Sequence, residues 1–278
     1  MNDYWIAILL GVVEGLTEFL PVSSTAHIRI CQSLLSMDMT SSYWKMFSVV
    51  IQLGAILAVV AYFWRKLVSF LQSFVSPVTP DEPRWRHPLV LVLISFVVTA
   101  GPCFLIDEKI GENLERLDFM AIALIVGGVL MWWVDKIYSP KFHTDAMERM
   151  TLAQALVIGL FQIFAAAFPG TSRSMATIAG GQIMGLDRKT ALEFSFFLSI
   201  PVMVAASGFK LTQFAMNTPE SVEGREWVVL GVGFLVSFIV AFAVIAWFMA
   251  WVRRHGFGVF ALYRLIAGLG LLAWIASS

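Results

Sequence analysis

The chain has 278 residues, of which 59% are hydrophobic and only 14% are charged, and its mean hydropathy is +0.80. A soluble domain of this length needs a larger charged surface, so the composition excludes an ordinary soluble protein and favours a membrane protein. The formal net charge is zero, and no basic surface for nucleic acid is indicated. Apolar stretches recur along the whole chain, which predicts a single membrane domain over residues 1–278.

The first apolar stretch, residues 4–20, contains two carboxylates, Glu14 and Glu18. Residues four apart share one face of a helix, so the two side chains are expected to stack. Carboxylates inside a membrane are energetically expensive, and two of them repel each other unless a cation or a proton lies between them. We interpret the pair as a divalent-metal site or an acid–base pair. The structural alternative is a helix end at the interface, where both carboxylates reach water.

A hydroxyl-rich turn, residues 21–25, follows this stretch, and His27 lies two residues beyond it. Ser23, Ser24 and Thr25 are expected at the start of the next helix, where N–H groups favour phosphate. The same residues also make an ordinary N-cap without any ligand. His27 adds a group that exchanges a proton near neutral pH, which favours chemistry over a purely structural role.

Six further segments approach the length of about 20 apolar residues that a membrane-spanning helix needs. These predicted spans cover residues 47–64, 89–106, 119–134, 194–209, 227–252 and 257–276. Arg264 lies inside the last span and is expected to have a structural partner. Gln52 and Gln162 are expected to form hydrogen bonds between helices.

A second apolar stretch, residues 152–168, also stops at a polar turn, residues 169–174. After its proline, this turn contains Gly170, Thr171, Ser172, Arg173 and Ser174. Glycine lets a ligand approach the backbone, and Arg173 offers a fork of donors that matches phosphate oxygens. Arg173 is also able to neutralise Glu14 and Glu18, and the two roles are compatible.

The two halves of the chain repeat. A constant separation of 148 positions relates Gly11 to Gly159, Pro21 to Pro169 and Ser24 to Ser172. Each half, over about residues 1–135 and 151–278, consists of a re-entrant helix pair and three spans. Because a re-entrant pair returns to its own side and three is odd, the second half begins on the opposite face. The predicted fold is an all-α polytopic membrane protein with six transmembrane helices and two re-entrant hairpins in an inverted-topology repeat, whose polar turns meet near the middle.

The connecting loops predict the orientation. One side carries Arg65, Lys66, Arg84, Arg86, Lys136, Lys141, Arg149, Arg188, Lys189, Arg253 and Arg254. The other side carries Lys109, Arg116, Lys210 and Arg225, with Arg29 and Lys45 in the first hairpin. The richer side is expected to be cytoplasmic, which puts both termini and the opening of the first hairpin on the outer, periplasmic side.

Residues 14–25 together with His27 resemble the signature of the undecaprenyl-diphosphate phosphatase family of the bacitracin-resistance type. Residues 169–174 resemble that family's second motif, and the resemblance extends over the whole chain, including residues 50–54 and 193–196. It implies removal of the terminal phosphate of undecaprenyl diphosphate at the outer face of the bacterial cytoplasmic (inner) membrane. This reaction recycles the carrier lipid for cell-wall synthesis and confers bacitracin resistance.

The resemblance also implies the site residues. The active-site positions would be Glu14, Glu18, Ser24, His27 and Arg173. The phosphate contacts would be Ser23, Thr25, Gly170, Thr171, Ser172 and Ser174. A divalent cation, Mg²⁺ or Ca²⁺, is the expected cofactor on Glu14 and Glu18, and a polyprenyl diphosphate lipid is the expected substrate. Ala26 and Met175 stand where the family usually has glycine, which predicts a tighter pocket.

The expected reaction is an attack on the terminal phosphorus by Ser24, or by a water that Ser24 positions, with His27 managing the proton. Ser24, His27 and water all remain open as the nucleophile. A second hypothesis is a transporter or flippase of polyprenyl phosphate lipids, because inverted repeats with broken helices also build secondary transporters. A transporter has no need of a serine–histidine pair beside phosphate donors, so the enzyme is favoured.

Overall fold

The computed structural model describes residues 2–38, 41–76, 83–105, 116–217 and 224–277. Within these ranges the fold is all-helical, with eleven α-helices and no strand. Six helices are long and apolar enough to cross a membrane: α3 (Ser42–Tyr62), α5 (Pro88–Leu105), α7 (Leu117–Tyr138), α10 (Arg188–Asn217), α11 (Gly224–Val252) and α12 (Gly258–Ser277). The prediction of an all-α, multi-pass membrane protein is confirmed. Ile106, the predicted end of the second span, and Lys109 lie outside the described residues.

The helices α10 and α11 are longer than the predicted spans, with 30 and 29 residues. Hydropathy places the start of α10 too late, because its first turns contain charged residues, and the structure shows that these charges are paired. Glu193 accepts from Lys66 Nζ at 2.5 Å, and Arg188 Nε donates to the buried Asp135 at 2.7 Å. The short helix α4 (Trp64–Val75) was not predicted, because it is too short and too polar to read as a span.

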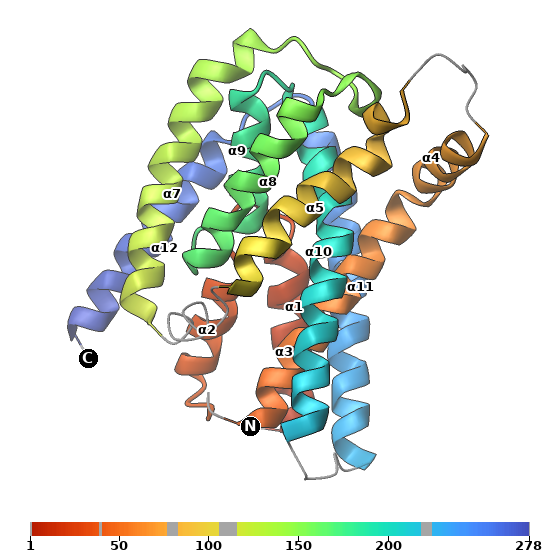
Figure 1. Cartoon of the computed structure of the whole chain (residues 1–278). Coiled ribbons are helices and arrows are strands. Elements are labelled where there is room, and N and C mark those ends of the chain that lie inside the picture. Colours follow the sequence, from red (N-terminus) through yellow and green to blue (C-terminus); the bar gives the residue numbers. More distant parts are fainter. Residues whose placement is uncertain (1, 39–40, 77–82, 106–115, 218–223, 278) are drawn as a thin grey trace.

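Two shorter helix pairs carry the polar turns. The first pair is α1 (Asp3–Thr17) and α2 (Ser24–Leu34), and the second is α8 (Leu152–Ala167) and α9 (Arg173–Ile183). In Figure 1 the first pair opens toward the bottom of the view and the second toward the top, so the turns meet inside the bundle. Ser174 Oγ donates to the Leu20 carbonyl at 3.0 Å, which links one turn directly to the other.

Helices from the two halves pack against each other. α1 lies on α11, α8 lies on α5, and α7 pairs with α12. Glycines permit the close approach: a Cβ on Gly11 would lie 2.7 Å from the Gly233 carbonyl oxygen, and one on Gly159 would lie 2.8 Å from that of Ser95. Such small-residue contacts are typical of helix packing in membranes. They place α1 and α8 directly against helices of the other half of the chain.

Candidate active site

A cavity of about 420 Å³ lies between the two polar turns and the helices α3, α5, α8 and α10. The turns and the helix starts after them line it with Glu18, Ser23, Ser24, Thr25, Pro169, Gly170, Ser172 and Arg173. Most of the remaining wall is apolar, and its other polar members are Gln52, Thr99, Gln162 and Lys210. The structure therefore brings the two polar segments of the sequence to one cavity.

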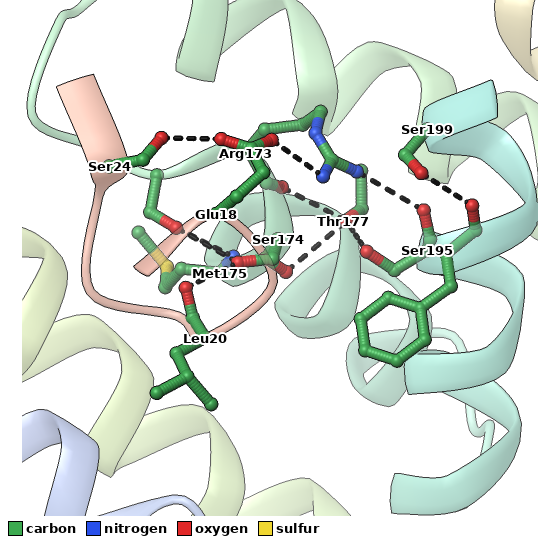
Figure 2. Close-up of polar contacts among 11 residues, drawn as sticks. Glu18, Leu20, Ser24, Arg173, Ser174, Met175, Thr177, Ser195 and Ser199 are labelled. Atoms are coloured by element: carbon green, nitrogen blue, oxygen red, sulfur yellow. Dashed lines mark hydrogen bonds and ion pairs between the residues drawn. The ribbon is translucent and has the colours of Figure 1, made fainter. Parts of the chain in front are cut away.

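Glu18 lies between the first residues of α2 and α9 (Figure 2). Its Oε2 accepts a hydrogen bond from Ser24 Oγ, and its Oε1 accepts one from Arg173 Nη2 at 3.1 Å. The ion pair is largely desolvated, because the Glu18 side chain is 7% exposed and that of Arg173 is 14% exposed. The Ser24 hydroxyl thus already has a carboxylate that is able to receive its proton.

Arg173 is held from several directions. Its Nη1 donates to the Ser195 carbonyl of α10 at 3.2 Å, and its guanidinium lies 5.9 Å from the centre of the Phe19 ring. Thr177 Oγ1 donates to the Arg173 carbonyl at 2.9 Å and lies 2.7 Å from Ser195 Oγ, which ties the first turn of α9 to α10. The guanidinium therefore keeps a fixed position at the cavity wall.

Glu14 lies one helical turn before Glu18, whose N–H donates to the Glu14 carbonyl at 2.9 Å. Its side chain is buried and does not line the cavity, and its Oε1 has no hydrogen-bond partner among the described residues. A buried carboxylate oxygen without a partner is costly, so this position calls for a proton or a cation. The two carboxylates consequently differ: Glu18 faces the cavity and Glu14 lies behind it.

Both helix starts have the same unusual backbone. Ser23 and Ser172 are N-cap residues with φ of +75° and +73°, and their side chains accept from the N–H groups of Ala26 and Met175. The structure thus aligns Ser23 with Ser172, so the predicted pairing of Ser24 with Ser172 is wrong by one position. Between its proline and its N-cap serine, the second turn contains two residues where the first contains one, and the glycine among them has φ +95°.

His27 is directed toward α12. Its Nδ1 lies 2.7 Å from the Ser23 carbonyl and its Nε2 lies 2.6 Å from the Tyr263 hydroxyl, and the two rings stack. A carbonyl only accepts, so the proton of the neutral ring is on Nδ1 and Nε2 accepts from Tyr263. His27 is not part of the cavity wall, and the structure does not bring it together with Ser24 around the cavity. No sequence pattern indicated Tyr263.

The other predicted phosphate contacts divide into two groups. Thr25 and Gly170 line the cavity, whereas Thr171 and Ser174 do not. Ser174 is fully buried and lies 3.0 Å from Ser172 Oγ, in addition to its bond to the first turn. Its place is that of a link between the two turns.

Ala26 and Met175 do not line the cavity, so they do not narrow it as predicted. Both lie in the first turn of a helix, at φ values open to any residue. Met175 is buried beside Gly127, and a Cβ added to Gly127 would lie 2.9 Å from the Cε atom of Met175. The missing side chain of Gly127 makes the room that the methionine needs.

Arg264 connects both turns to α7 through hydrogen bonds. It is fully buried and donates to the carbonyls of Pro21 at 3.2 Å, Gly170 at 3.1 Å and Ala123 at 3.0 Å. The prediction of a structural partner is confirmed, although the partners are backbone carbonyls of three segments. Hydropathy gives no signal for such contacts, because they join residues far apart in the chain.

Gln162 does not form the predicted bond between helices. It is 2% exposed, it lines the cavity, and neither its Oε1 nor its Nε2 has a hydrogen-bond partner among the described residues. The prediction is wrong because this side chain lines the cavity, and no polar group of another described helix lies within hydrogen-bond distance of it. Lys210, expected in a connecting loop, is part of α10 and also lines the cavity.

No group of three or more His, Cys, Asp and Glu side chains within the described residues is arranged to hold a metal ion. Glu14 and Glu18 thus offer two carboxylates and no further acidic ligand. This donor set fits a hard cation such as Mg²⁺, which commonly uses one or two carboxylates and takes its other ligands from water and substrate phosphates.

Apolar helices that bury carboxylates, hydroxyls and a guanidinium around one cavity define an integral membrane protein with an enzyme-like site. Residues 7–270 match the model of the family described as "Bacitracin resistance protein BacA". The chain belongs to this family.

Curated relatives agree with this assignment. One from Koribacter versatilis is 50% identical over 282 residues, which cover 99% of this chain and 99% of the relative. Relatives from Caldanaerobacter subterraneus and Novosphingobium aromaticivorans are each 42% identical, covering 97% and 99% of this chain and 95% and 99% of their own. All three are named undecaprenyl-diphosphatase. The family resemblance and the prediction of a phosphatase are confirmed.

Proposed function

We propose that the chain hydrolyses undecaprenyl diphosphate to undecaprenyl phosphate and inorganic phosphate, and thereby recycles the carrier lipid for cell-wall synthesis. The names of the relatives support this substrate. The observation that carries the proposal is the bridge from Ser24 through Glu18 to Arg173 at the cavity wall. Bacitracin resistance is proposed on the basis of the family.

In the proposed reaction, Ser24 Oγ attacks the terminal phosphorus and its proton passes to Glu18. The bond from that phosphorus to the bridging oxygen breaks, and undecaprenyl phosphate leaves with this oxygen. Water then hydrolyses the phosphoserine, which releases phosphate and restores Ser24. Arg173 compensates the negative charge that develops on the phosphoryl oxygens. In the alternative version, Ser24 and Glu18 orient a water that attacks directly.

In this proposal His27 positions the first turn and does not act as the base, which departs from the sequence-based expectation. What supports the change is that its Nδ1–H is committed to the Ser23 carbonyl and its Nε2 to Tyr263. Glu18 has the geometry of the base, since it already accepts the Ser24 hydrogen bond. Ser23, Thr25, Gly170 and Ser172 are proposed to contact phosphate, with Thr171 and Ser174 in support behind them.

Glu14 and Glu18 are proposed to hold Mg²⁺ or Ca²⁺, with Glu14 Oε1 as the available ligand atom. When bound, the cation would supply positive charge for the diphosphate. Removal of divalent ions with a chelator should abolish phosphate release, and addition of Mg²⁺ or Ca²⁺ should restore it. Unchanged activity in the chelator would contradict the metal site.

The two short helix pairs are proposed to be re-entrant hairpins in an inverted repeat. In support, α1 and α2 have 15 and 11 residues and α8 and α9 have 16 and 11. At 1.5 Å per residue, the longest is about 24 Å, short of the hydrocarbon thickness of about 30 Å. The first helix of each pair packs on a helix of the other half, α1 on α11 and α8 on α5, which also fits two halves related by a pseudo-twofold axis.

Both termini and the opening of the site are proposed to face the outer side of the bacterial cytoplasmic membrane. Cysteines placed at Asn2 and at Ser277, in a chain with Cys31 and Cys103 replaced by alanine, should react with a membrane-impermeant reagent in intact cells. A cysteine at Arg253 serves as the control and should react only after permeabilisation. The reverse pattern would invert the proposed topology.

The catalytic proposal is tested with purified protein in detergent. The wild type should release phosphate from a polyprenyl diphosphate without any membrane gradient, which a pure transporter would not do. Ser24→Ala should lower kcat by about 100-fold or more, the usual scale for loss of a catalytic group. Ser199→Ala is the matched control, because Ser199 is buried and, among the described residues, its hydroxyl donates to the Phe196 carbonyl of its own helix α10. Full activity in Ser24→Ala would refute the site assignment.

A further inference from the structure

Gln162 is a buried polar side chain of the cavity wall to which the proposed reaction assigns no role. Both amide atoms lack a hydrogen-bond partner among the described residues, although the side chain is 2% exposed. An amide buried without partners loses its hydration and receives nothing in exchange. Since the amide lines a cavity, its partner is expected to come from whatever fills that cavity.

A comparison within the same helix shows that this is not the rule for buried glutamines in the protein. Gln154, also in α8 and also 2% exposed, uses its whole amide. Its Oε1 accepts from Thr151 N at 2.8 Å, and its Nε2 donates to Thr144 Oγ1 at 3.1 Å and to the Met184 carbonyl at 3.0 Å. A structural glutamine in α8 is therefore fully bonded, and Gln162 differs from it.

The position of Gln162 also corresponds to that of a site residue in the other half. Gln162 follows Gly159 by three residues, and Glu14 follows Gly11 by three residues. Each glycine marks the place where its helix touches the backbone of a neighbouring helix. The second hairpin thus presents a neutral amide where the first presents a carboxylate, and this amide reaches the cavity wall.

We propose that Gln162 is a substrate-binding residue whose Nε2–H donates to a non-bridging oxygen of the diphosphate. Phosphate oxygens only accept, so they match this donor. Arg173 contributes positive charge at the same cavity, and a carboxylate in place of the amide would repel the ligand. The proposal rests on the proposed function, because it names a contact of the same substrate.

The test compares Gln162→Met with Gln154→Met, two substitutions of the same kind in one helix. Methionine keeps the length of the side chain and removes both hydrogen-bonding atoms. Gln162→Met should lower kcat/KM for phosphate release by about 10- to 100-fold, the loss of one hydrogen bond to a charged group. Its melting temperature without substrate should equal or exceed that of the wild type, since no hydrogen bond within the protein is lost.

Gln154→Met should show the opposite pattern, with a lower melting temperature and kcat/KM within about threefold of the wild type for the folded protein. Wild-type kcat/KM in Gln162→Met would overturn the proposal. So would a loss of melting temperature as large as that of Gln154→Met, because it would reveal a partner within the protein.

A second variant and a second probe keep the test decisive. Gln162→Glu preserves the shape and should be less active than Gln162→Met, because its negative charge faces the phosphates; equal or higher activity would overturn the proposal. Inorganic diphosphate should raise the melting temperature of the wild type and not that of Gln162→Met, and an equal rise in both would also overturn it. A wild type that binds diphosphate and releases no phosphate would refute the proposed function alone.

Discussion

At the scale of single residues, the site depends on the difference between two carboxylates that look alike in the sequence. Glu18 accepts hydrogen bonds from Ser24 and from Arg173, whereas Glu14 lies behind it. The spacing of four residues correctly predicts that they share a helix face. It does not predict which of them meets the second turn, because that depends on the packing of Arg173, 155 positions away from Glu18.

Glu18→Gln tests the proposed roles of Glu18 as the base for Ser24 and as the partner of Arg173, because glutamine has nearly the same shape as glutamate. The amide cannot take the Ser24 proton and no longer balances the Arg173 charge, so kcat should fall by about 100-fold or more. Glu193→Gln is the control, because Glu193 is an equally buried carboxylate that pairs with Lys66 away from the cavity. Initial rates of phosphate release measure both. A comparable loss in the two variants would indicate a general effect of removing buried charge.

At the scale of elements, the first residues of α2 and α9 determine the directions in which Ser24 and Arg173 point. Each begins after a serine with positive φ, a conformation that costs of order 1–3 kcal/mol for a residue other than glycine. The serine nevertheless fits, because its hydroxyl caps the N–H of the third residue of the helix. The first residue of each helix, Ser24 in α2 and Arg173 in α9, then faces Glu18.

Substitutions at Ser172 distinguish strain from capping. Ser172→Ala keeps the strained backbone and loses the cap, so the free energy of unfolding should fall by about 1–2 kcal/mol. Ser172→Gly loses the cap and relieves the strain, so its change should stay within about 0.5 kcal/mol. Thermal or denaturant unfolding in detergent checks both values. A glycine variant less stable than the alanine variant would contradict the role assigned to positive φ.

At the scale of the whole molecule, hydropathy predicts the six spans, because a long apolar helix is a local property of the chain. The stops at the two polar turns are local as well, since each follows from a proline and hydroxyl residues. Three features of the site could not be predicted, because they depend on how distant helices pack. They are the pairing of His27 with Tyr263, the three carbonyls around Arg264 and the unbonded amide of Gln162. The helix α4 was missed for a different reason, because its hydropathy is too low to indicate a span.

Arg264 offers a test of the contacts that hold the turns together. Arg264→Met leaves the carbonyls of Pro21, Gly170 and Ala123 without their donor, so the free energy of unfolding should fall by about 3 kcal/mol. Arg225→Met is the control, because Arg225 forms an exposed ion pair and should contribute less than about 1 kcal/mol. Melting temperatures in detergent compare the two. Equal stability of both variants would show that the turns do not need this guanidinium.

The bridge through Glu18 makes the protein comparable to a heterodimer whose two subunits have been joined in one polypeptide. The proposed nucleophile and base come from the first half and the arginine from the second, while Arg264 of the second half grips Pro21 of the first. A chain cut in the connection between η2 (Ser139–Lys141) and η3 (Met147–Arg149) would therefore give two inert fragments. Produced together, they should reassemble into an active protein.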